Sequence, residues 1–250
     1  MLKEERQQRV LELLAGSHRL VASELPGVLG VSADTVRRDL DELAEAGYLR
    51  RVHGGALARS SVPRSYEGRG AQAVAGKREA ARAAATLLSP GQVAILDGGS
   101  TALALAELLP AGHTGTFVTH SPPVAAALGR HPGVEVVVIG GLLDRRAMVA
   151  TGAQTIDSYR RISADICFLG IWSLDAEQGI SEGYPEEAEV RRVLLERSDR
   201  VVGLASREKL GTAAPFSIGP ATALTHLATE RDVPAQLLAP FAELGLRIVQ

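Results

Sequence analysis

The first fifty residues carry apolar side chains at helical spacing, separated by short polar stops. Residues 9–14 follow this spacing, and the pair Gly16–Ser17 is expected to close the helix. Ser23 is a suitable N-cap for a second, short helix that would carry Pro26 at its third position and stop at Gly30. The pattern therefore predicts two helices before residue 31.

A third helix has the most regular pattern. Ser32 is its N-cap, and Val36, Leu40 and Leu43 fall at i, i+4 and i+7 as one buried stripe. Residues 48–55 then predict a strand and a glycine-rich turn. Three helices with a tight turn before the third, followed by a small hairpin, are typical of a winged helix-turn-helix, which we assign to the first 57 residues.

The pattern changes along the rest of the chain. Residues 58–76 show no sustained apolar period and contain Ser, Pro and Gly, so they are predicted to be a linker. From residue 77 to 250, short apolar runs recur with helical stretches between several of them, which predicts a mostly parallel sheet with covering helices. The expected strands are 93–96, 115–118, 134–139, 166–169, 200–204 and 246–249. The fold class is thus an α+β two-domain chain.

Composition indicates a globular protein and excludes several other classes of protein, but it does not indicate a function. The 250 residues are 46% hydrophobic and 22% charged, with a formal net charge of −2, which is ordinary for a globular chain and gives no general basic signal for nucleic acid. The single cysteine, Cys167, excludes a disulfide framework and is expected to be a buried apolar residue. The six histidines are scattered, so no metal site and no cofactor are predicted. No apolar run reaches the roughly 18 residues of a membrane span, and we expect a cytoplasmic protein with no membrane partner.

Arginines on the third helix and the hairpin are the DNA-binding candidates. Arg37 and Arg38 lie in the exposed first turns, where arginine can contact guanine edges, and Thr35 beside them can contact a phosphate or a thymine methyl. The alternative is ordinary ion pairing with nearby acids on a solvated helix face, because this region is slightly acidic overall. The full set of DNA-binding candidates is Ser32, Thr35, Arg37, Arg38, Arg50, Arg51 and His53.

A resemblance favours the DNA-binding reading. Residues 25–40, LPGVLGVSADTVRRDL, resemble the helix-turn-helix of the DeoR family with its VS..T.RRDL signature. Residues 43–56, LAEAGYLRRVHGGA, resemble the continuation L...G.L.R.HGGA. The resemblance implies a transcriptional regulator that binds a double-stranded DNA operator as a homodimer or homotetramer.

The second region has one candidate anion site. Residues 93–106 read as strand, glycine-rich turn and helix, and such a turn presents backbone N–H groups to an anion at the helix N-terminus. The alternative is an ordinary turn with Ser100 as N-cap. In an open parallel sheet the carboxyl ends of the strands share one crevice, which other strand ends and a lysine could complete. The effector-binding candidates are Asp97, Gly98, Gly99, Ser100, Thr101, Thr119, His120, Gly140, Gly141 and Lys209.

This region is also similar to the DeoR sensor domain. The similarity rests on Lys77, residues 96–101, residues 137–141, residues 165–170 and residues 186–190. It implies a fold related to ribose-5-phosphate isomerases and CoA transferases, and a phosphorylated sugar or related metabolite as effector. Four positions depart from the family's usual residues, namely His120, Ser173, Ser206 and Glu230.

Enzymatic activity is the competing class. Asp97, Glu187 or Glu189 could act as a general base in a phosphosugar isomerase or transferase, but ion pairs with neighbouring arginines would equally explain the two glutamates. No nucleophile–base–orienter set is present, so no catalytic residue is assigned. Trp172 either stacks on a ligand or caps the sheet. The sequence therefore predicts a repressor of sugar or related metabolism genes, with an enzyme, or a sensor domain that only dimerises, as alternatives.

Overall fold

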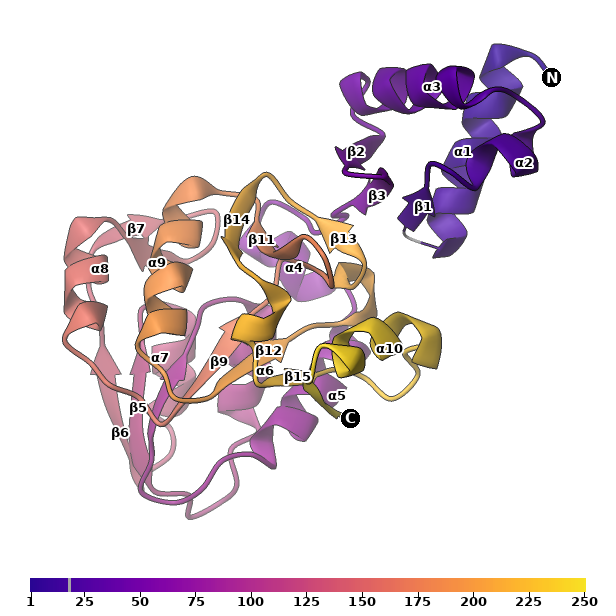
Figure 1. Cartoon of the computed structure of the whole chain (residues 1–250). Coiled ribbons are helices and arrows are strands. Elements are labelled where there is room, and N and C mark those ends of the chain that lie inside the picture. The colour runs from indigo at the N-terminus through magenta and orange to yellow at the C-terminus, as the bar shows by residue number, and fades with distance from the viewer. Residues whose placement is uncertain (18) are drawn as a thin grey trace.

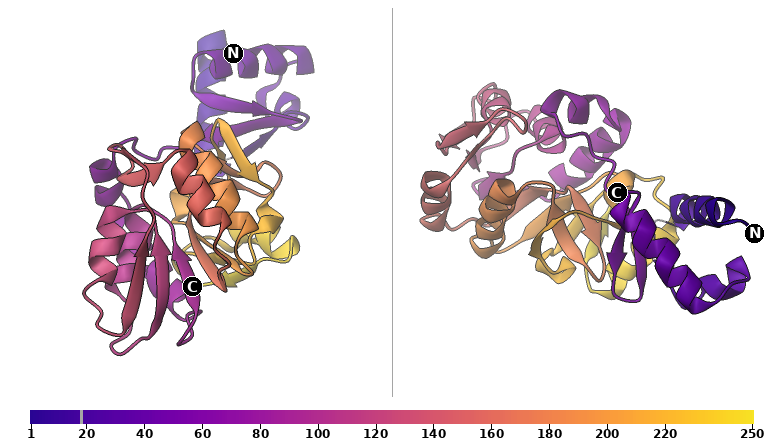
Figure 2. Two further views of the ribbon diagram at one scale, coloured as in Figure 1. Left: turned by 90° about the vertical axis from the view of Figure 1, so that its left-hand side faces the viewer. Right: turned by 90° about the horizontal axis from the view of Figure 1, so that it is seen from above.

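The computed structural model describes residues 1–17 and 19–250, so His18 lies outside the described residues. A small N-terminal domain stands beside a larger α/β domain, and the two meet at the strands labelled β3 and β13 (Figure 1). The two further views show the same separation of a small and a large body (Figure 2). The predicted two-domain α+β organisation is confirmed.

The N-terminal domain is a winged helix-turn-helix, as the sequence predicts. The predicted stripe packs inward, because Val36, Leu40 and Leu43 are at most 4% exposed. Ser32 is the N-cap of the third helix, and its hydroxyl accepts a hydrogen bond from the Thr35 N–H. The helices are α1 (Lys3–Ser17), α2 (Leu25–Leu29) and α3 (Ala33–Glu45), and the strands are β1 (Arg19–Val21), β2 (Leu49–Val52) and β3 (Gly55–Arg59).

One local prediction in this domain was wrong, and one strand was missed. Helix α2 begins one residue later than a Ser23 cap would place it: Glu24 is the N-cap, without a side-chain capping bond, and Pro26 is the second helical residue. Strand β1 was not predicted, because three residues are too short to show a period. It pairs antiparallel with β3, which also forms the wing hairpin with β2. Gly54 has a φ of 76° in the two-residue turn of that hairpin, a conformation that favours glycine.

The segment assigned to a linker is largely ordered structure. Strand β3 continues to Arg59, and helix α4 (Tyr66–Ala71) follows before α5 (Val74–Ala85) begins. Helix α4 is too short for a helical period to be visible in sequence, and its glycines suggested a loop. The Ser65 hydroxyl caps it by accepting from the Gly68 N–H. This connection therefore has a fixed path between the domains.

A seven-stranded parallel sheet forms the centre of the larger domain. Its order is β16-β15-β12-β9-β4-β5-β6, and every neighbouring pair is parallel. Six strands match the predicted runs within a residue or so; β15 was not predicted. The strands are β4 (Val93–Leu96), β5 (Gly115–Thr119), β6 (Val134–Val138), β9 (Ile166–Gly170), β12 (Val201–Leu204), β15 (His226–Ala228) and β16 (Arg247–Val249).

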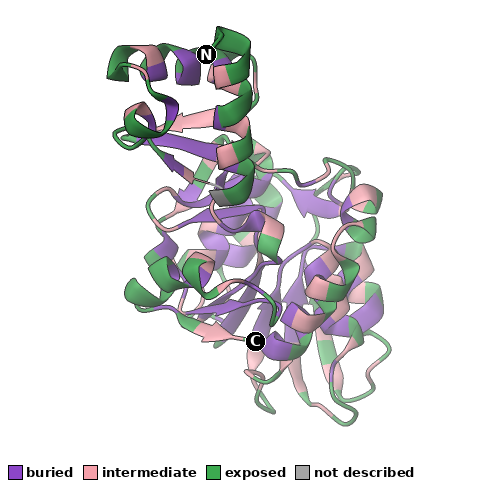
Figure 3. Cartoon of the chain, turned by 90° about the vertical axis from the view of Figure 1, so that its right-hand side faces the viewer, coloured by how far each residue is buried: buried purple, intermediate pink, exposed green. Residues whose placement is uncertain are grey.

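Helices cover both faces of the sheet, and alternating side chains divide between two cores. In β9, Ile166 and Phe168 belong to the core under α5, α6 and α7, whereas Cys167 and Leu169 belong to the core under α8, α9 and α10. Figure 3 shows the buried strands between more exposed helices. The Cys167 side chain is fully buried, as predicted. These helices are α6 (Ser100–Glu107), α7 (Pro122–Leu128), α8 (Ala153–Arg160), α9 (Pro185–Glu196) and α10 (Ala235–Glu243).

Short strands and turns complete the larger domain. Strands β7 and β8 form a hairpin, and β10, β11 and β14 form an antiparallel sheet. Strand β13 instead joins the sheet of the N-terminal domain, parallel to β3. The remaining elements are β7 (Leu142–Asp144), β8 (Val149–Thr151), β10 (Ser173–Asp175), β11 (Gly179–Glu182), β13 (Thr212–Ala213), β14 (Phe216–Gly219) and the 3-10 turns η1 (Arg207–Lys209) and η2 (Ala221–Ala223). Across the described ranges, no helix is long and apolar enough to cross a bilayer.

Candidate functional site

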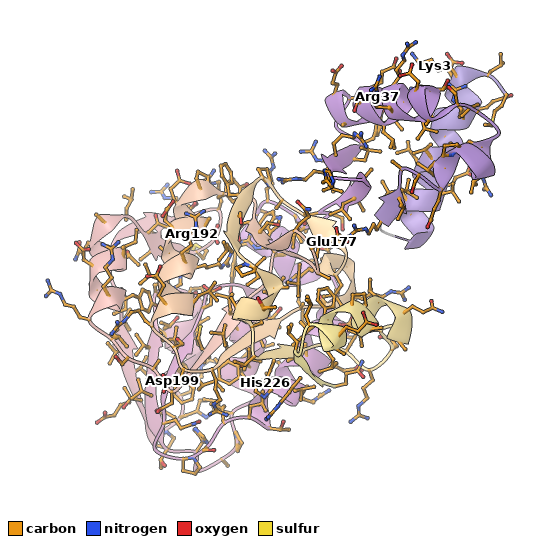
Figure 4. All side chains as sticks on the ribbon, in the orientation of Figure 1. Lys3, Arg37, Glu177, Arg192, Asp199 and His226 are labelled. Carbon is orange, nitrogen blue, oxygen red and sulfur yellow. The ribbon has the colours of Figure 1, made fainter. Side chains whose placement is uncertain are left out.

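Helix α3 lies on the side of the N-terminal domain away from the α/β domain (Figure 1), and Figure 4 labels Arg37 on it. The side chains of Arg37 and Arg38 are 66% and 75% exposed. Both pair with Asp34, at N–O distances of 2.5 and 2.8 Å, so the ion-pair alternative describes the free protein. Such exposed pairs are worth about 0–1 kcal/mol, so they do not prevent the guanidiniums from exchanging Asp34 for DNA.

The remaining DNA-binding candidates lie in different settings. Arg51 pairs with Asp41 at 2.8 Å and also donates to the Gly55 carbonyl at 2.7 Å, while His53 is exposed at the wing turn. Ser32 and Thr35 share a hydroxyl contact of 2.9 Å at the start of α3. Arg50 differs, because its guanidinium donates to the carbonyl of Ala214 in the α/β domain. The structure thus gathers six candidates on the helix-and-wing surface and places Arg50 at the domain junction.

The turn after β4 is held by the carboxylate that precedes it. One Asp97 oxygen accepts from the Gly98 N–H at 2.7 Å, and the other accepts from the Gly170 N–H at 2.9 Å and from Arg191 Nε at 2.8 Å. A Cβ on Gly98 would lie 2.1 Å from the Val149 side chain, so only glycine fits there. Asp97 is fully buried and positions the turn and Arg191.

Helix α6 begins immediately after this turn. Gly99, with a φ of 98°, is its N-cap, so the alternative in which Ser100 caps the helix is wrong. The Ser100 hydroxyl donates to the Arg69 carbonyl at 3.3 Å. The Thr101 hydroxyl is buried and has no hydrogen-bond partner. A buried hydroxyl without a partner at a helix N-terminus is a group that an anion would satisfy.

A cavity opens against this helix N-terminus. It is lined by the turn, by β9 and the residues after it, by α9 and by the connecting helix α4. Of the predicted effector residues, Gly98, Gly99, Ser100, Thr101 and Lys209 line it. Trp172 also lines it, 9% exposed, with the Arg69 guanidinium carbon 5.5 Å from its ring centroid. The lining residues are Val62, Arg69, Gly98, Gly99, Ser100, Thr101, Ala147, Gly170, Ile171, Trp172, Glu187, Arg191 and Lys209.

The charged side chains of the cavity are buried and mostly cationic. Arg69, Arg191 and Lys209 are 6–8% exposed, against one carboxylate on the wall, Glu187, at 5%. Arg191 is neutralised by Asp97 and by Glu182. Within residues 1–17 and 19–250, no ion pair joins Arg69 or Lys209 to a carboxylate. The cavity therefore has cationic charge that the protein itself does not neutralise.

Burial shifts the protonation equilibria in this cavity. Desolvation, aided by the nearby Lys77 ammonium, lowers the pKa of Lys209 to about 7. Desolvation also raises the pKa of Glu187 to about 7, so its carboxyl is partly protonated at neutral pH. The pKa of Arg69 is lowered by burial as well. All three shifts follow from charged groups held away from water without full compensation.

Lys77 holds the end of helix α4, which contributes Arg69 to the cavity wall. Its ammonium is 4% exposed and donates to the carbonyls of Arg69 and Gln72 at the end of α4. Arg69 in turn donates to the carbonyls of Arg64 and Arg146, at 3.0 and 3.2 Å. These contacts fix the position of the arginine that the connecting segment contributes to the wall.

The other predicted effector residues lie outside the cavity lining. Thr119 and His120 are buried behind it; His120 Nδ1 is 2.9 Å from the Tyr159 hydroxyl, and burial lowers the pKa of His120 to about 4. Gly140 and Gly141 are exposed, and the Gly140 carbonyl accepts from Thr155. The single crevice expected for all strand ends is therefore not formed: β6 is at the sheet edge, and the two glycines that follow it pack against Thr151 of β8 and Thr155 of α8.

Of the cationic wall, Lys209 was identified from the sequence, but Arg69 and Arg191 were missed. Arg69 lies in the assumed linker, where no local pattern marks it. Arg191 gave a usable signal, because it sits between Ala188 and Leu194 on the buried face of α9, where a charged residue needs a partner. Glu187 was expected in an ordinary ion pair; it does pair with Arg191, at 3.5 Å, but both side chains are buried on the cavity wall, whereas Glu189 forms an exposed pair with Arg192.

The positions that depart from the family pattern also lie away from the lining. Ser206 Oγ donates to Glu208 at 2.6 Å, and a Glu230 carboxylate oxygen accepts from the Arg207 N–H at 2.8 Å. Ser173 is buried in β10. Neither these residues nor His120 line the cavity.

A helix-turn-helix domain with an exposed arginine-bearing helix, joined to an α/β domain with a cationic cavity, defines a DNA-binding regulator with a separate sensor. Residues 6–62 match the DeoR-like helix-turn-helix domain, and residues 72–231 match the DeoR C terminal sensor domain. The chain belongs to the DeoR family of transcriptional regulators.

Individual relatives agree with this assignment. The HTH-type transcriptional regulator GolR of Listeria innocua is 31% identical over 98% of this chain and 97% of its own length. The glycerol-3-phosphate regulon repressor of Escherichia coli K12 is 28% identical over 95% of both chains. Among solved structures, ribose 5-phosphate isomerase A of Methanocaldococcus jannaschii matches with a TM-score of 0.38 and 18% identity, over 53% of this chain and 52% of that one. Because its relatives are named as regulators and repressors, the chain is a DNA-binding regulator and not an enzyme.

Proposed function

We propose that this protein represses genes of sugar or related metabolism and that a phosphorylated sugar or similar anionic metabolite releases it from DNA. The observation that carries the proposal is the cavity at the N-terminus of α6. There, backbone N–H groups, the partnerless Thr101 hydroxyl and the cations Arg69 and Lys209 surround one enclosed space. These are the groups that bind a phosphate.

DNA binding is assigned to α3 and the wing. Arg37 and Arg38 would contact base edges, with Ser32, Thr35, Arg51 and His53 at the phosphates or the adjacent groove. Since one recognition helix offers only a few contacts, tight binding needs two copies on two half-sites, which supports a homodimer or homotetramer. A name among the relatives, glycerol-3-phosphate regulon repressor, supports a phosphorylated effector.

The test is fluorescence anisotropy of the labelled DNA upstream of the gene, at fixed salt, with a panel of sugar phosphates and glycerol 3-phosphate. We expect tight binding that one panel member reverses. Binding that no phosphorylated compound alters would contradict the effector assignment, and absence of DNA binding would contradict the regulator assignment. Inorganic phosphate serves as the control for charge alone.

A further inference from the structure

One short segment joins the cavity to the DNA-binding domain. Lys209 lines the cavity, and three residues later β13 pairs in parallel with β3, with Thr212 opposite Ala58 and Ala213 opposite Arg59. The Thr212 hydroxyl donates to the Lys209 carbonyl at 2.8 Å, which ties the two ends of the segment together. The wing sheet is therefore completed by a strand that the effector domain supplies.

Side chains reinforce this junction from both domains. Arg50 of β2 donates to the Ala214 carbonyl, and the Ala214 N–H donates to Ser181 at 2.9 Å. On the opposite side of the wing, Arg19 lies 2.5 Å from Glu177 and 3.7 Å from Asp175. Figure 4 shows Glu177 where the two domains meet. The domains are thus joined by backbone pairing, a hydrogen bond and ion pairs.

The same junction forms part of the cavity wall. Val62 and Trp172 line the cavity and pack together with Ala214 in one small apolar cluster. Trp172 thus shares a cluster with Ala214, the residue that follows β13, and Lys209 is hydrogen-bonded to Thr212 of β13. A movement of Trp172 or Lys209 that admits a ligand therefore displaces β13. Arg69 closes another side from the connecting helix α4.

In this conformation the cavity is too small for its proposed ligand. The space that water can occupy is about 30 Å³, room for about two water molecules. A phosphorylated sugar needs several times more, so it binds preferentially to a conformation in which part of the wall has moved. A ligand that binds one conformation more tightly shifts the conformational equilibrium toward it, by at most the ratio of its affinities for the two conformations.

We propose that the β3–β13 junction is a releasable dock: it holds the DNA-binding domain while the cavity is empty, and a phosphorylated ligand that fills the cavity detaches it. This rests on the proposed function. In the docked state the recognition helices of an oligomer have a fixed spacing. In the undocked state each is only tethered, so the second half-site contact is lost.

A reversible cross-link tests the dock directly. The double variant Arg59→Cys/Ala213→Cys places two thiols on paired residues of β3 and β13. Neighbouring strands lie about 4.8 Å apart, within the range that a disulfide spans. The native Cys167 is fully buried in the parallel sheet, so it does not compete. The reduced double variant is the matched control for the oxidised one.

We expect the oxidised protein to bind upstream DNA as tightly as the reduced protein but to resist release by the panel compound that frees the reduced protein. Its affinity for that compound should fall by about 5- to 150-fold, the usual range of coupling between sites. Equal release of the oxidised and reduced forms would overturn the dock. If the reduced form binds DNA and no compound releases it, the effector assignment is wrong. The dock is then tested by a measurement of DNA affinity that needs no ligand.

The ligand-free measurement uses the ion pair on the opposite side of the wing. Arg19→Glu places a carboxylate against Asp175 and Glu177, so it should weaken the dock and lower DNA affinity several-fold. The double variant Arg19→Glu/Glu177→Arg should restore it. Neither residue lines the cavity. Unchanged DNA affinity in Arg19→Glu, or loss without restoration in the double variant, would contradict the dock.

Discussion

The two groups of cations in this protein differ in their surroundings, and the difference fits the roles proposed for them. Arg37 and Arg38 on α3 are exposed and share Asp34, while Arg69 and Lys209 are buried and have no carboxylate partner among the described residues. The exposed pair loses little when it exchanges one anion for another, which suits reversible contact with many DNA phosphates and bases. Burial of the second pair costs free energy, which the backbone carbonyls around Arg69 offset in part and a bound anion would offset further.

The largest effect is expected on the exposed side of this comparison. The double variant Arg37→Ala/Arg38→Ala removes two base contacts of about 1–3 kcal/mol each, so DNA affinity should fall at least about 30-fold. Fluorescence anisotropy at fixed salt measures this. Arg160→Ala is the matched control, because Arg160 forms a similar exposed i, i+3 pair with Asp157 on α8. A comparable loss in the control would show a general charge effect.

Among the buried cations, Lys209→Met should lower the affinity for the sugar phosphate by about 10- to 100-fold, the equivalent of one charge-assisted hydrogen bond. The melting temperature without ligand should not fall, because the variant removes a charge that burial already disfavours. Calorimetric titration and thermal melting measure the two quantities. Lys3→Met, an exposed lysine paired with Glu42, is the control. Unaltered ligand affinity in Lys209→Met would remove Lys209 from the site.

The affinity of the cavity for an anion should depend on pH. The pKa values of Lys209 and Glu187 are both about 7 in the empty cavity. As pH rises above 7, Lys209 loses its positive charge and Glu187 gains a negative one, so anion affinity should fall, by up to about tenfold per pH unit for each proton lost. Calorimetry between pH 7 and 8.5 checks this, since the phosphate is already mostly a dianion there.

Glu187→Gln separates the two contributions. It removes the glutamate's titration, so affinity should decline less steeply with pH, while the Lys209 contribution remains. A slope as steep as that of the unmodified protein would mean that Glu187 does not affect the bound anion.

The smallest effect is expected at the acid that pairs with both exposed arginines. Asp34→Asn should raise DNA affinity by about two- to fivefold, because it removes a weak competing pair and a negative charge near the DNA. It should also lower the melting temperature slightly, since Asp34 lies in the first turn of α3 and complements the helix dipole. A drop in DNA affinity would show that Asp34 orients the arginines for DNA.

The sequence by itself determined the elements whose patterns are long or whose turns are distinctive. The stripe on α3, the Ser32 cap and six of the seven sheet strands are local features, because helical and strand periods act within about ten residues. The glycine-rich turn at residues 97–101 was identified for the same reason: the strand before it and the helix after it are adjacent in the chain.

The sequence placed Lys209 with the glycine-rich turn, but only the tertiary structure showed that Arg69 and Arg191 share the cavity with them. Arg69 comes from a connecting helix of six residues, Lys209 from a 3-10 turn, and Arg191 from the buried face of α9. No periodicity links them, and their proximity follows from the order of the strands and the path of the connection. The same holds for β13, whose two residues complete the wing sheet across the domain boundary. A segment of two or three residues shows too little periodicity to predict which strand it pairs with. The pKa of a buried group depends on the neighbours that the tertiary structure places around it, so the sequence does not give it.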